Sequence, residues 1–188
     1  MPPATLVIPL EVAPDLRLEP VQPAHAAPLF ALVDGDRERL GARLPWVEGT
    51  RSPEDTGAFI EAMRRQQDVA GGGDGGGAWV MTAGDEGVVG VVGTHEIHWP
   101  HRRASIGYWI AGAFEGRGLV TRSVARVTDH LLGNGMHRVE IRAMVDNERS
   151  RAVADRCGYQ LEGTHRAVEW MHGRPIDLAV YGRLGGDA

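Results

Sequence analysis

The chain has 188 residues, a formal net charge of −5 and a single cysteine, Cys157. This length suits one domain with a sizeable core, and the sequence holds no run of about 18 apolar residues that would span a membrane. The negative charge disfavours nonspecific nucleic-acid binding, and a lone cysteine fits a reducing compartment. Residues 1–5 lack the basic start of a secretion signal. We therefore expect one cytoplasmic domain over 1–188, with no nucleic-acid or membrane partner.

Hydrophobic periodicity predicts a mixed α+β domain with antiparallel strands and helical crossovers. Ser52, followed by Pro53 and two acidic residues, is typical of a helix start. Six glycines around Asp74, at 71–77, predict a flexible loop. The core is expected over about 16–184, with strands at 16–19, 78–83, 88–98, 103–110, 138–144, 159–170 and 175–183, and helices after Pro23, from Ser52, at 117–133 and at 149–156.

The segment 106–121 carries the most informative pattern of the chain. An apolar strand, Ile106 to Ile110, is followed by the turn Gly116-Arg117-Gly118 and then by a helix with one apolar stripe. Glycines let the backbone approach an anion, and the free N–H groups of a helix start can bind it. This order indicates a phosphate site, although a tight turn that merely needs two glycines would look the same.

Two familiar nucleotide sites do not fit this turn. A dinucleotide-binding fold requires a third glycine, where this chain has Thr121. A P-loop requires a lysine, and all 20 basic residues here are arginine. Both interpretations are therefore excluded.

Further along, a second group of short motifs accompanies the glycine turn. They are Asn147-Glu148-Arg149-Ser150, Gly158-Tyr159, Glu162-Gly163-Thr164, the stretch from Arg166 through Glu169 to Gly173, and the late pair Asp177 and Tyr181. Together with the Ile-Gly-Tyr-Trp strand, this order resembles the GNAT superfamily of N-acetyltransferases, in its RimJ/RimL-type branch (ribosomal-protein-alanine acetyltransferase-like). The resemblance covers about 16–184. It implies the α+β GNAT fold, a mixed and mostly antiparallel twisted sheet of six to seven strands with about four helices on its faces.

The resemblance implies acetyl-CoA as co-substrate and no metal. In this family the pyrophosphate binds backbone N–H groups of the glycine turn, and the thioester carbonyl binds backbone N–H near the end of the preceding strand. Asn147 resembles the residue that binds the pantetheine arm, although an asparagine there also suits a turn or a helix N-cap. The expected cofactor-binding residues are Ile110, Gly116, Arg117, Gly118, Leu119, Val120, Thr121, Asn147 and Ser150.

The catalytic residues that the resemblance implies are Ser150 and Glu169. Ser150 matches a proposed general acid toward the leaving thiolate, and Glu169 matches a general base acting through water. Many other family members carry a tyrosine near the helix that here holds Ala154 and Cys157, and its absence favours Ser150. The simpler alternatives remain open: a first-turn serine, a solvated strand carboxylate and, for Cys157, a small buried side chain.

The implied reaction transfers an acetyl group to a primary amine by direct attack. Near pH 7.4 a protein α-amino group, with a pKa of about 7.7–8.0, costs less than about 1 kcal/mol to deprotonate, whereas a lysine side chain costs about 4 kcal/mol. A single carboxylate is adequate for the first amine and less so for the second. This difference favours the N-terminal α-amino group of a protein or peptide as the acceptor.

Several alternatives stay open for the acceptor and the assembly. The acceptor could be a polyamine, an amino acid or an antibiotic, the donor could be succinyl-CoA, and a CoA-binding interaction module would need neither catalytic residue. A homodimer is common among RimL-type relatives. Trp46, Tyr108 and Trp109 are candidates to line the acceptor cleft, although tryptophans more often pack in cores. The His-rich stretch at 95–101 matches no usual metal-ligand spacing, and its role is unassigned.

Overall fold

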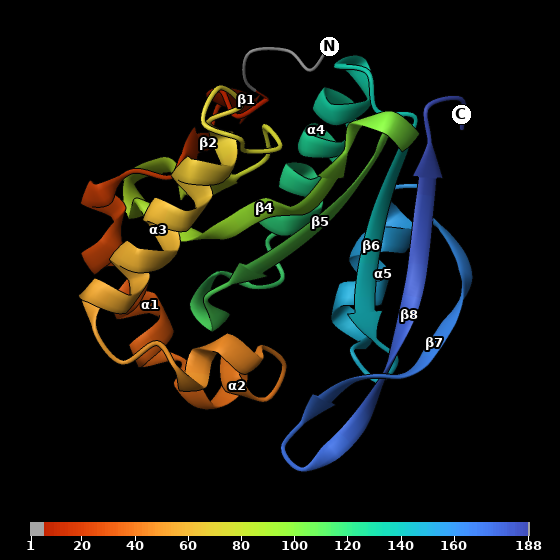
Figure 1. Ribbon diagram of the computed structural model, residues 1–188. Helices are drawn as coiled ribbons and strands as arrows, with labels where there is room; N and C mark the ends of the chain where they lie inside the picture. Colours follow the sequence, from red (N-terminus) through yellow and green to blue (C-terminus); the bar gives the residue numbers. More distant parts are fainter. Residues whose placement is uncertain (1–5, 188) are drawn as a thin grey trace.

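The computed structural model describes residues 6–187, so the start at 1–5 that bears on a secretion signal lies outside it. It forms one eight-stranded sheet in the order β1-β2-β3-β4-β5-β6-β8-β7 (Figure 1). The strands are β1 (Leu10–Ala13), β2 (Leu16–Pro20), β3 (Ala78–Ala83), β4 (Val88–His98), β5 (Arg103–Ile110), β6 (Arg138–Met144), β7 (Gln160–Met171) and β8 (Arg174–Leu184).

Five α-helices within the described part of the chain connect and cover these strands. They are α1 (Ala26–Gly35), α2 (Arg37–Gly41), α3 (Pro53–Gln67), α4 (Leu119–Gly133) and α5 (Glu148–Arg156). The start of α3 follows the expected pattern, because Ser52 and Asp55 form a reciprocal capping box. Within residues 6–187, no helix is long and apolar enough to cross a membrane.

The two faces of the sheet bury different helices. Along β3, Trp79 and Met81 join the large cluster formed with α4 and α5, whereas Ala78 and Val80 face the opposite way and pack with α1 and α3. This alternation follows from the two-residue period of a strand, and burial on both sides explains why β3 is apolar at every position but Thr82. Figure 1 shows α3 on one side of the sheet and α4 on the other.

The sheet opens between β5 and β6. Among the described residues these are the only neighbouring strands that run parallel, and they pair only from Arg103 opposite Arg138 to Ile106 opposite Ile141. Beyond these pairs β5 stays with β4 as far as Ile110, while β6 stays with β8 as far as Met144. Figure 1 shows the two strands diverging toward the end that faces α2.

This architecture confirms the predicted α+β GNAT fold and its mostly antiparallel sheet. The sheet has eight strands rather than six or seven, because the four-residue strand β1 pairs with β2. The fifth helix is α2, whose five residues are too few to show a helical period. Leu6 and Leu10, which precede residue 16, also lie in the main core.

The glycine-rich loop is hydrogen-bonded to its surroundings through Asp74. The Asp74 carboxylate accepts from the backbone N–H groups of Gly76 and Ile97, and its carbonyl accepts from the indole N–H of Trp99 at 2.7 Å. A side chain at Gly73 would overlap backbone oxygens at the end of α3. The glycines therefore allow close packing here, and the Trp99 hydrogen bond helps to hold the loop.

Candidate active site

The glycine turn lies where β5 ends and α4 begins. Gly116 and Gly118 have φ angles of 75° and 72°, a left-handed conformation that favours glycine. A Cβ built at either position would have no heavy atom within 4 Å, so this backbone faces open space. Gly118 is the N-cap of α4, and Leu119, Val120 and Thr121 form its first turn. Free N–H groups at an open helix start fit a bound phosphate group.

The arginines of this region already have acidic partners. Arg117 is 2.7 Å from Glu86 in the β3–β4 turn, and its guanidinium lies 5.8 Å from the Phe114 ring centroid. Arg122, one turn into α4, pairs with Asp15 at 2.8 Å. The expected contact between Arg117 and a phosphate remains a prediction. For this contact, the Arg117 guanidinium would have to leave Glu86 and bind a phosphate oxygen instead.

A pair of hydroxyl groups lies across the opening between β5 and β6. Tyr108 points from β5 toward the start of α5, and its hydroxyl oxygen is 3.0 Å from Ser150 Oγ and 3.1 Å from the Ser150 carbonyl oxygen. Burial raises the pKa of Tyr108 far above its usual value, so the phenol stays protonated at neutral pH. The protonated phenol donates to the Ser150 carbonyl, and in its contact with Ser150 Oγ either hydroxyl can be the donor.

Helix α5 is positioned by Asn147 and Cys157. The Asn147 side chain caps the helix by accepting from the Ser150 N–H at 3.2 Å, so the N-cap interpretation is correct. Its contact with a pantetheine arm stays a prediction. Cys157 is buried, its Sγ donates to the Thr121 carbonyl, and burial raises the pKa of its thiol to about 11. A thiol in this environment is a packing residue and not a nucleophile.

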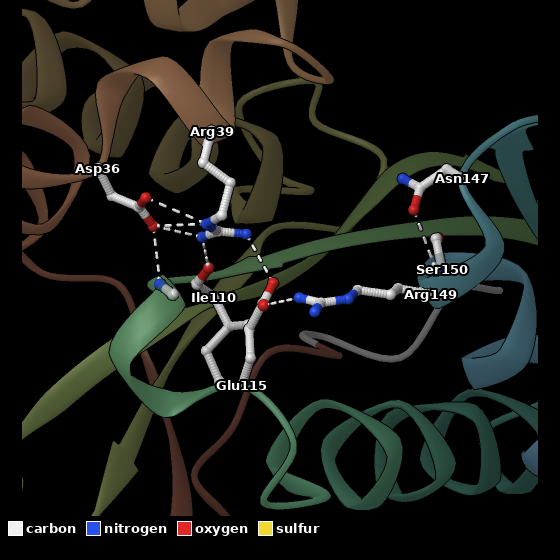
Figure 2. A network of polar contacts seen from close by, with 8 residues as sticks. Asp36, Arg39, Ile110, Glu115, Asn147, Arg149 and Ser150 are labelled. Atoms are coloured by element: carbon white, nitrogen blue, oxygen red, sulfur yellow. Dashed lines mark hydrogen bonds and ion pairs between the residues drawn. The ribbon is translucent and has the colours of Figure 1, made fainter.

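A network of charged groups fixes the end of β5 (Figure 2). Arg39, from α2, donates to the Ile110 carbonyl at 2.6 Å and to Glu115 at 2.6 Å, and it pairs with Asp36. Asp36 also accepts from the Gly112 N–H at 2.7 Å. Arg39 is the first cause that holds the pKa of Asp36 below its usual value, with the Gly112 N–H adding to it.

The same network reaches α5 and the segment after α2. Figure 2 shows the second oxygen of Glu115 paired with Arg149, one residue before Ser150. On the other side, Arg43 pairs with Asp146 at 2.5 Å, and His172 at the tip of the β7–β8 hairpin hydrogen-bonds the Gly41 carbonyl at 3.1 Å. The α2 segment therefore bridges the opening between β5 and β6.

Two tryptophans lie beside this bridge. The ring centroids of Trp46 and Trp109 are 5.8 Å apart with a tilt of 54°, and Trp46 is 41% exposed. Trp109 is partly buried against the clusters formed by α1, α2 and α3. This pair contacts the sheet face opposite to Tyr108, so the three candidate acceptor residues are split between the two sides of β5.

Glu169 is placed by a bulge in β7. The register slips between His165 and Glu169, and Ala167 within the bulge has a φ angle of 51°. The Asp177 carboxylate on β8 accepts from the Ala167 N–H at 2.7 Å, which holds the bulge in this shape. Glu169 lies opposite Ile176, whose neighbours along β8, Leu178 and Val180, share its face. Glu169 therefore points to the sheet face away from α4 and α5.

The structure brings Ser150, Asn147 and the glycine turn to one side of the opening and Glu169 to the other. The roles of these residues remain predictions. Sequence reasoning missed the contacts of Asp36, Arg39 and Glu115, since no local motif marks them. It also missed the physical roles of the late motif residues: Asp177 holds the bulge, and the Tyr181 hydroxyl accepts from Arg151 of α5 at 3.0 Å.

A diverging strand pair, an accessible glycine turn at a helix start and a hydroxyl pair between them are the arrangement expected of an acyltransferase that uses CoA thioesters. Residues 15–160 match the acetyltransferase (GNAT) domain family. The chain belongs to this family of acetyltransferases.

Two curated relatives align over most of their length. The ribosomal-protein-serine acetyltransferase of Escherichia coli K12 is 27% identical over 178 residues, which cover 93% of this chain and 96% of the relative. A putative ribosomal N-acetyltransferase of Bacillus subtilis 168, YdaF, is 31% identical over 169 residues, with 87% and 88% covered.

Solved structures show the same fold. RimL, the ribosomal L7/L12 α-N-protein acetyltransferase in complex with coenzyme A, has a TM-score of 0.87 at 25% identity, with 94% of this chain and 98% of that chain covered. The microcin C7 self-immunity acetyltransferase MccE, in complex with acetyl-CoA and AMP, has a TM-score of 0.86 at 24% identity, with 93% and 95% covered. At 24% identity, the similarity to MccE concerns the fold alone.

Proposed function

We propose that this protein transfers the acetyl group of acetyl-CoA to the N-terminal α-amino group of a protein or peptide. The observation that carries the proposal is the near full-length match to relatives named as ribosomal-protein acetyltransferases. The net charge of −5 agrees with cationic partners such as ribosomal proteins. We further propose that the enzyme works in the cytoplasm and forms a homodimer, as its RimL-type relatives often do.

In this proposal, acetyl-CoA binds on one side of the opening between β5 and β6, and the amine approaches from the other side. On the α4 and α5 side, the glycine turn would hold the pyrophosphate, Asn147 the pantetheine arm, and Ser150 the sulfur. On the opposite side, the amine would approach past Trp46 and Trp109 toward Glu169. An amine that attacks from one face and a thiolate that leaves on the other need separate proton acceptors and donors, which this division supplies.

Each residue has a defined role in this proposal. Backbone N–H groups near Ile110 polarise the thioester carbonyl. Glu169 acts as the general base and accepts the amine proton through an intermediary, for which water is the simplest choice. Ser150 protonates the departing thiolate, and Tyr108 donates to Ser150 to replace its proton. Arg39 keeps the Ile110 carbonyl engaged, so the end of β5 keeps one orientation while substrates exchange.

The acceptor is tested by following thiol release from acetyl-CoA with matched peptides. One peptide has a free α-amine and no lysine, and the second has the same sequence with a blocked α-amine and one added lysine. We expect turnover of the first and at least about 10-fold less of the second, since the lysine costs about 3 kcal/mol more to deprotonate. Polyamines, amino-sugar antibiotics and succinyl-CoA complete the panel. Preference for any of these would overturn the proposed acceptor or donor, and no turnover at all would indicate a binding module.

A further inference from the structure

His95 occupies an irregular position in the middle of the sheet. Thr94 of β4 pairs with Ile106 of β5 and Glu96 pairs with Ser105, so His95 is the extra residue of a bulge. Bulges often redirect a side chain beside a functional site. The neighbouring histidines do not share this place, because His98 and His101 stack on each other at 4.4 Å in the turn after β4.

The imidazole of His95 lies over Gly107. A Cβ at Gly107 would overlap the His95 ring and meet Nε2 first, so this glycine leaves the space that the ring fills. Gly107 is the first residue of β5 beyond the last pair with β6, which places the ring at the mouth of the opening. In the described part of the chain, residues 6–187, neither ring nitrogen of His95 has a hydrogen-bond partner, and the residue is accessible to solvent.

His95 faces the side of the sheet on which the amine would arrive. Tyr108 and Ile106 point to the α4 and α5 side, so Gly107 between them faces the other way, together with Trp109. On β6, Arg142 has the same orientation, because Ile141 and Ala143 are buried on the opposite side. Glu169 points to this face from β7. The ring of His95 therefore packs on the β5 backbone on the same sheet face as Arg142 and Glu169.

The charges around His95 suit a proton acceptor. Although the residue as a whole is exposed, the part of the ring that packs on the sheet loses water, and this desolvation lowers the pKa of His95 first. The positive charge of Arg142 lowers it further. Glu169 acts in the opposite direction and raises the pKa. The nearby charges on the flanking strands, Glu96 and Arg103, pair with each other at 2.9 Å. The ring is thus neutral at pH 7, and Glu169 stabilises its protonated form.

We propose that His95 is a further catalytic residue, which receives the proton of the attacking amine and passes that proton on to Glu169. The inference rests on the proposed function, since it assigns the intermediary between the amine and that carboxylate. The amine nitrogen forms a bond to the thioester carbonyl carbon, and the carbon–sulfur bond breaks. The amine proton moves to His95 Nε2 and on to the Glu169 carboxylate, and Ser150 delivers a proton to the thiolate. Solvent then takes the proton from Glu169 and returns one to Ser150 through Tyr108.

The kinetic test uses His95→Gln with whichever amine the wild-type enzyme acetylates. We expect kcat at pH 7 to fall by about 100-fold or more, within the usual range for a general base, while acetyl-CoA affinity stays within about 2-fold. The pH profile of the wild type should lose activity below an inflection under about 6.5, and the variant should lack that inflection. The matched control is His98→Gln, which should keep wild-type kcat.

A second measurement reports on His95 without turnover. The pKa of His95, followed by nuclear magnetic resonance of the ring, should fall in Glu169→Gln and rise in Arg142→Gln, because each substitution removes the charge that shifts it. Gly107→Ala should displace the ring and lower kcat as His95→Gln does. A fully active His95→Gln enzyme, or a pKa of His95 that ignores both substitutions, would overturn the inference. If only the choice of peptide acceptor is wrong, the panel shows it in the wild type, and the His95 comparison proceeds with the accepted amine.

Discussion

The hydroxyl oxygens of Tyr108 and Ser150 lie 3.0 Å apart, although 42 residues separate them in the chain. Tyr108 comes from β5 and Ser150 from the first turn of α5, so the contact closes the opening between β5 and β6 on the α4 and α5 side. The proposed acid is therefore better described as a pair of hydroxyls than as one serine.

Ser150→Ala should lower kcat by about 10- to 100-fold, and by less than Glu169→Gln at pH 7. A thiolate with a pKa near 8.5 leaves tolerably well without a proton, so the donor helps modestly. Tyr108→Phe should have a smaller effect than Ser150→Ala, because solvent can replace the phenol. Steady-state kinetics of the three single variants would check this order. Full activity and normal acetyl-CoA affinity in Ser150→Ala would leave the serine as a helix residue only.

Glu169→Gln should be most harmful at low pH. Below the pKa of the amine, most acceptor is protonated and a base is needed, whereas raising the pH supplies free amine and should partly restore turnover. We expect a loss of about 10²–10⁴-fold at pH 6.5, a smaller loss at pH 9, and unchanged acetyl-CoA affinity. A rate that is independent of this substitution from pH 6 to 9 would reduce Glu169 to a surface carboxylate of β7.

Gly118→Asn should weaken acetyl-CoA binding by at least about 10-fold with little loss of stability. Asparagine tolerates the left-handed φ angle of 72° at this position, but its side chain would enter the open space beside the turn. Valine would block the same space at a cost of about 1–2 kcal/mol in backbone strain, so it is the poorer probe. Calorimetric titration with acetyl-CoA measures the effect. Gly135→Asn, at another glycine of positive φ beyond the far end of α4, is the control and should bind normally.

Most of the strands and helices of this fold can be predicted from local patterns in the sequence. The seven longer strands alternate or form apolar runs, and Ser52 and Gly118 mark helix starts, so these elements can be predicted from neighbouring residues alone. The four residues of β1 contain only two periods of strand alternation, and the five residues of α2 contain less than two helical turns. They form because β2 and the end of β5 offer partners, and no local signal reports such partners.

The candidate site also has parts that local sequence patterns predict and parts that they do not. The glycine turn, Ser150 and Glu169 belong to short motifs, so the sequence identifies them as candidates. The contact between Arg39 and Glu115 spans 76 residues, and it depends on how α2 packs on the sheet. The position of His95 over Gly107 depends on a bulge whose side-chain direction no alternation rule predicts. Contacts between residues far apart in the chain, such as these two, can be identified only once the packing of the elements and the register of the strands are known.

The Arg39 network predicts a pH-dependent loss of stability. Arg39→Met would leave Asp36 and Glu115, each about a quarter exposed, without their shared partner. Since Arg39 is itself 38% exposed, we expect the free energy of unfolding at pH 7 to fall by only about 1–2 kcal/mol. Arg64→Met, which breaks an exposed pair with Glu61, is the matched control and should cost at most about 0.5 kcal/mol.

The pH dependence of that difference follows from the depressed pKa of Asp36. A carboxylate with a lowered folded-state pKa stabilises the protein above its unfolded pKa, near 3.9, and this contribution is lost as the pH falls through the folded value. Urea unfolding of wild type and Arg39→Met should therefore differ most above about pH 5 and converge as the pH falls below about 4. A constant difference down to pH 3 would mean that Arg39 acts through its packing and its bond to the Ile110 carbonyl, and that the ion pair with Asp36 contributes little.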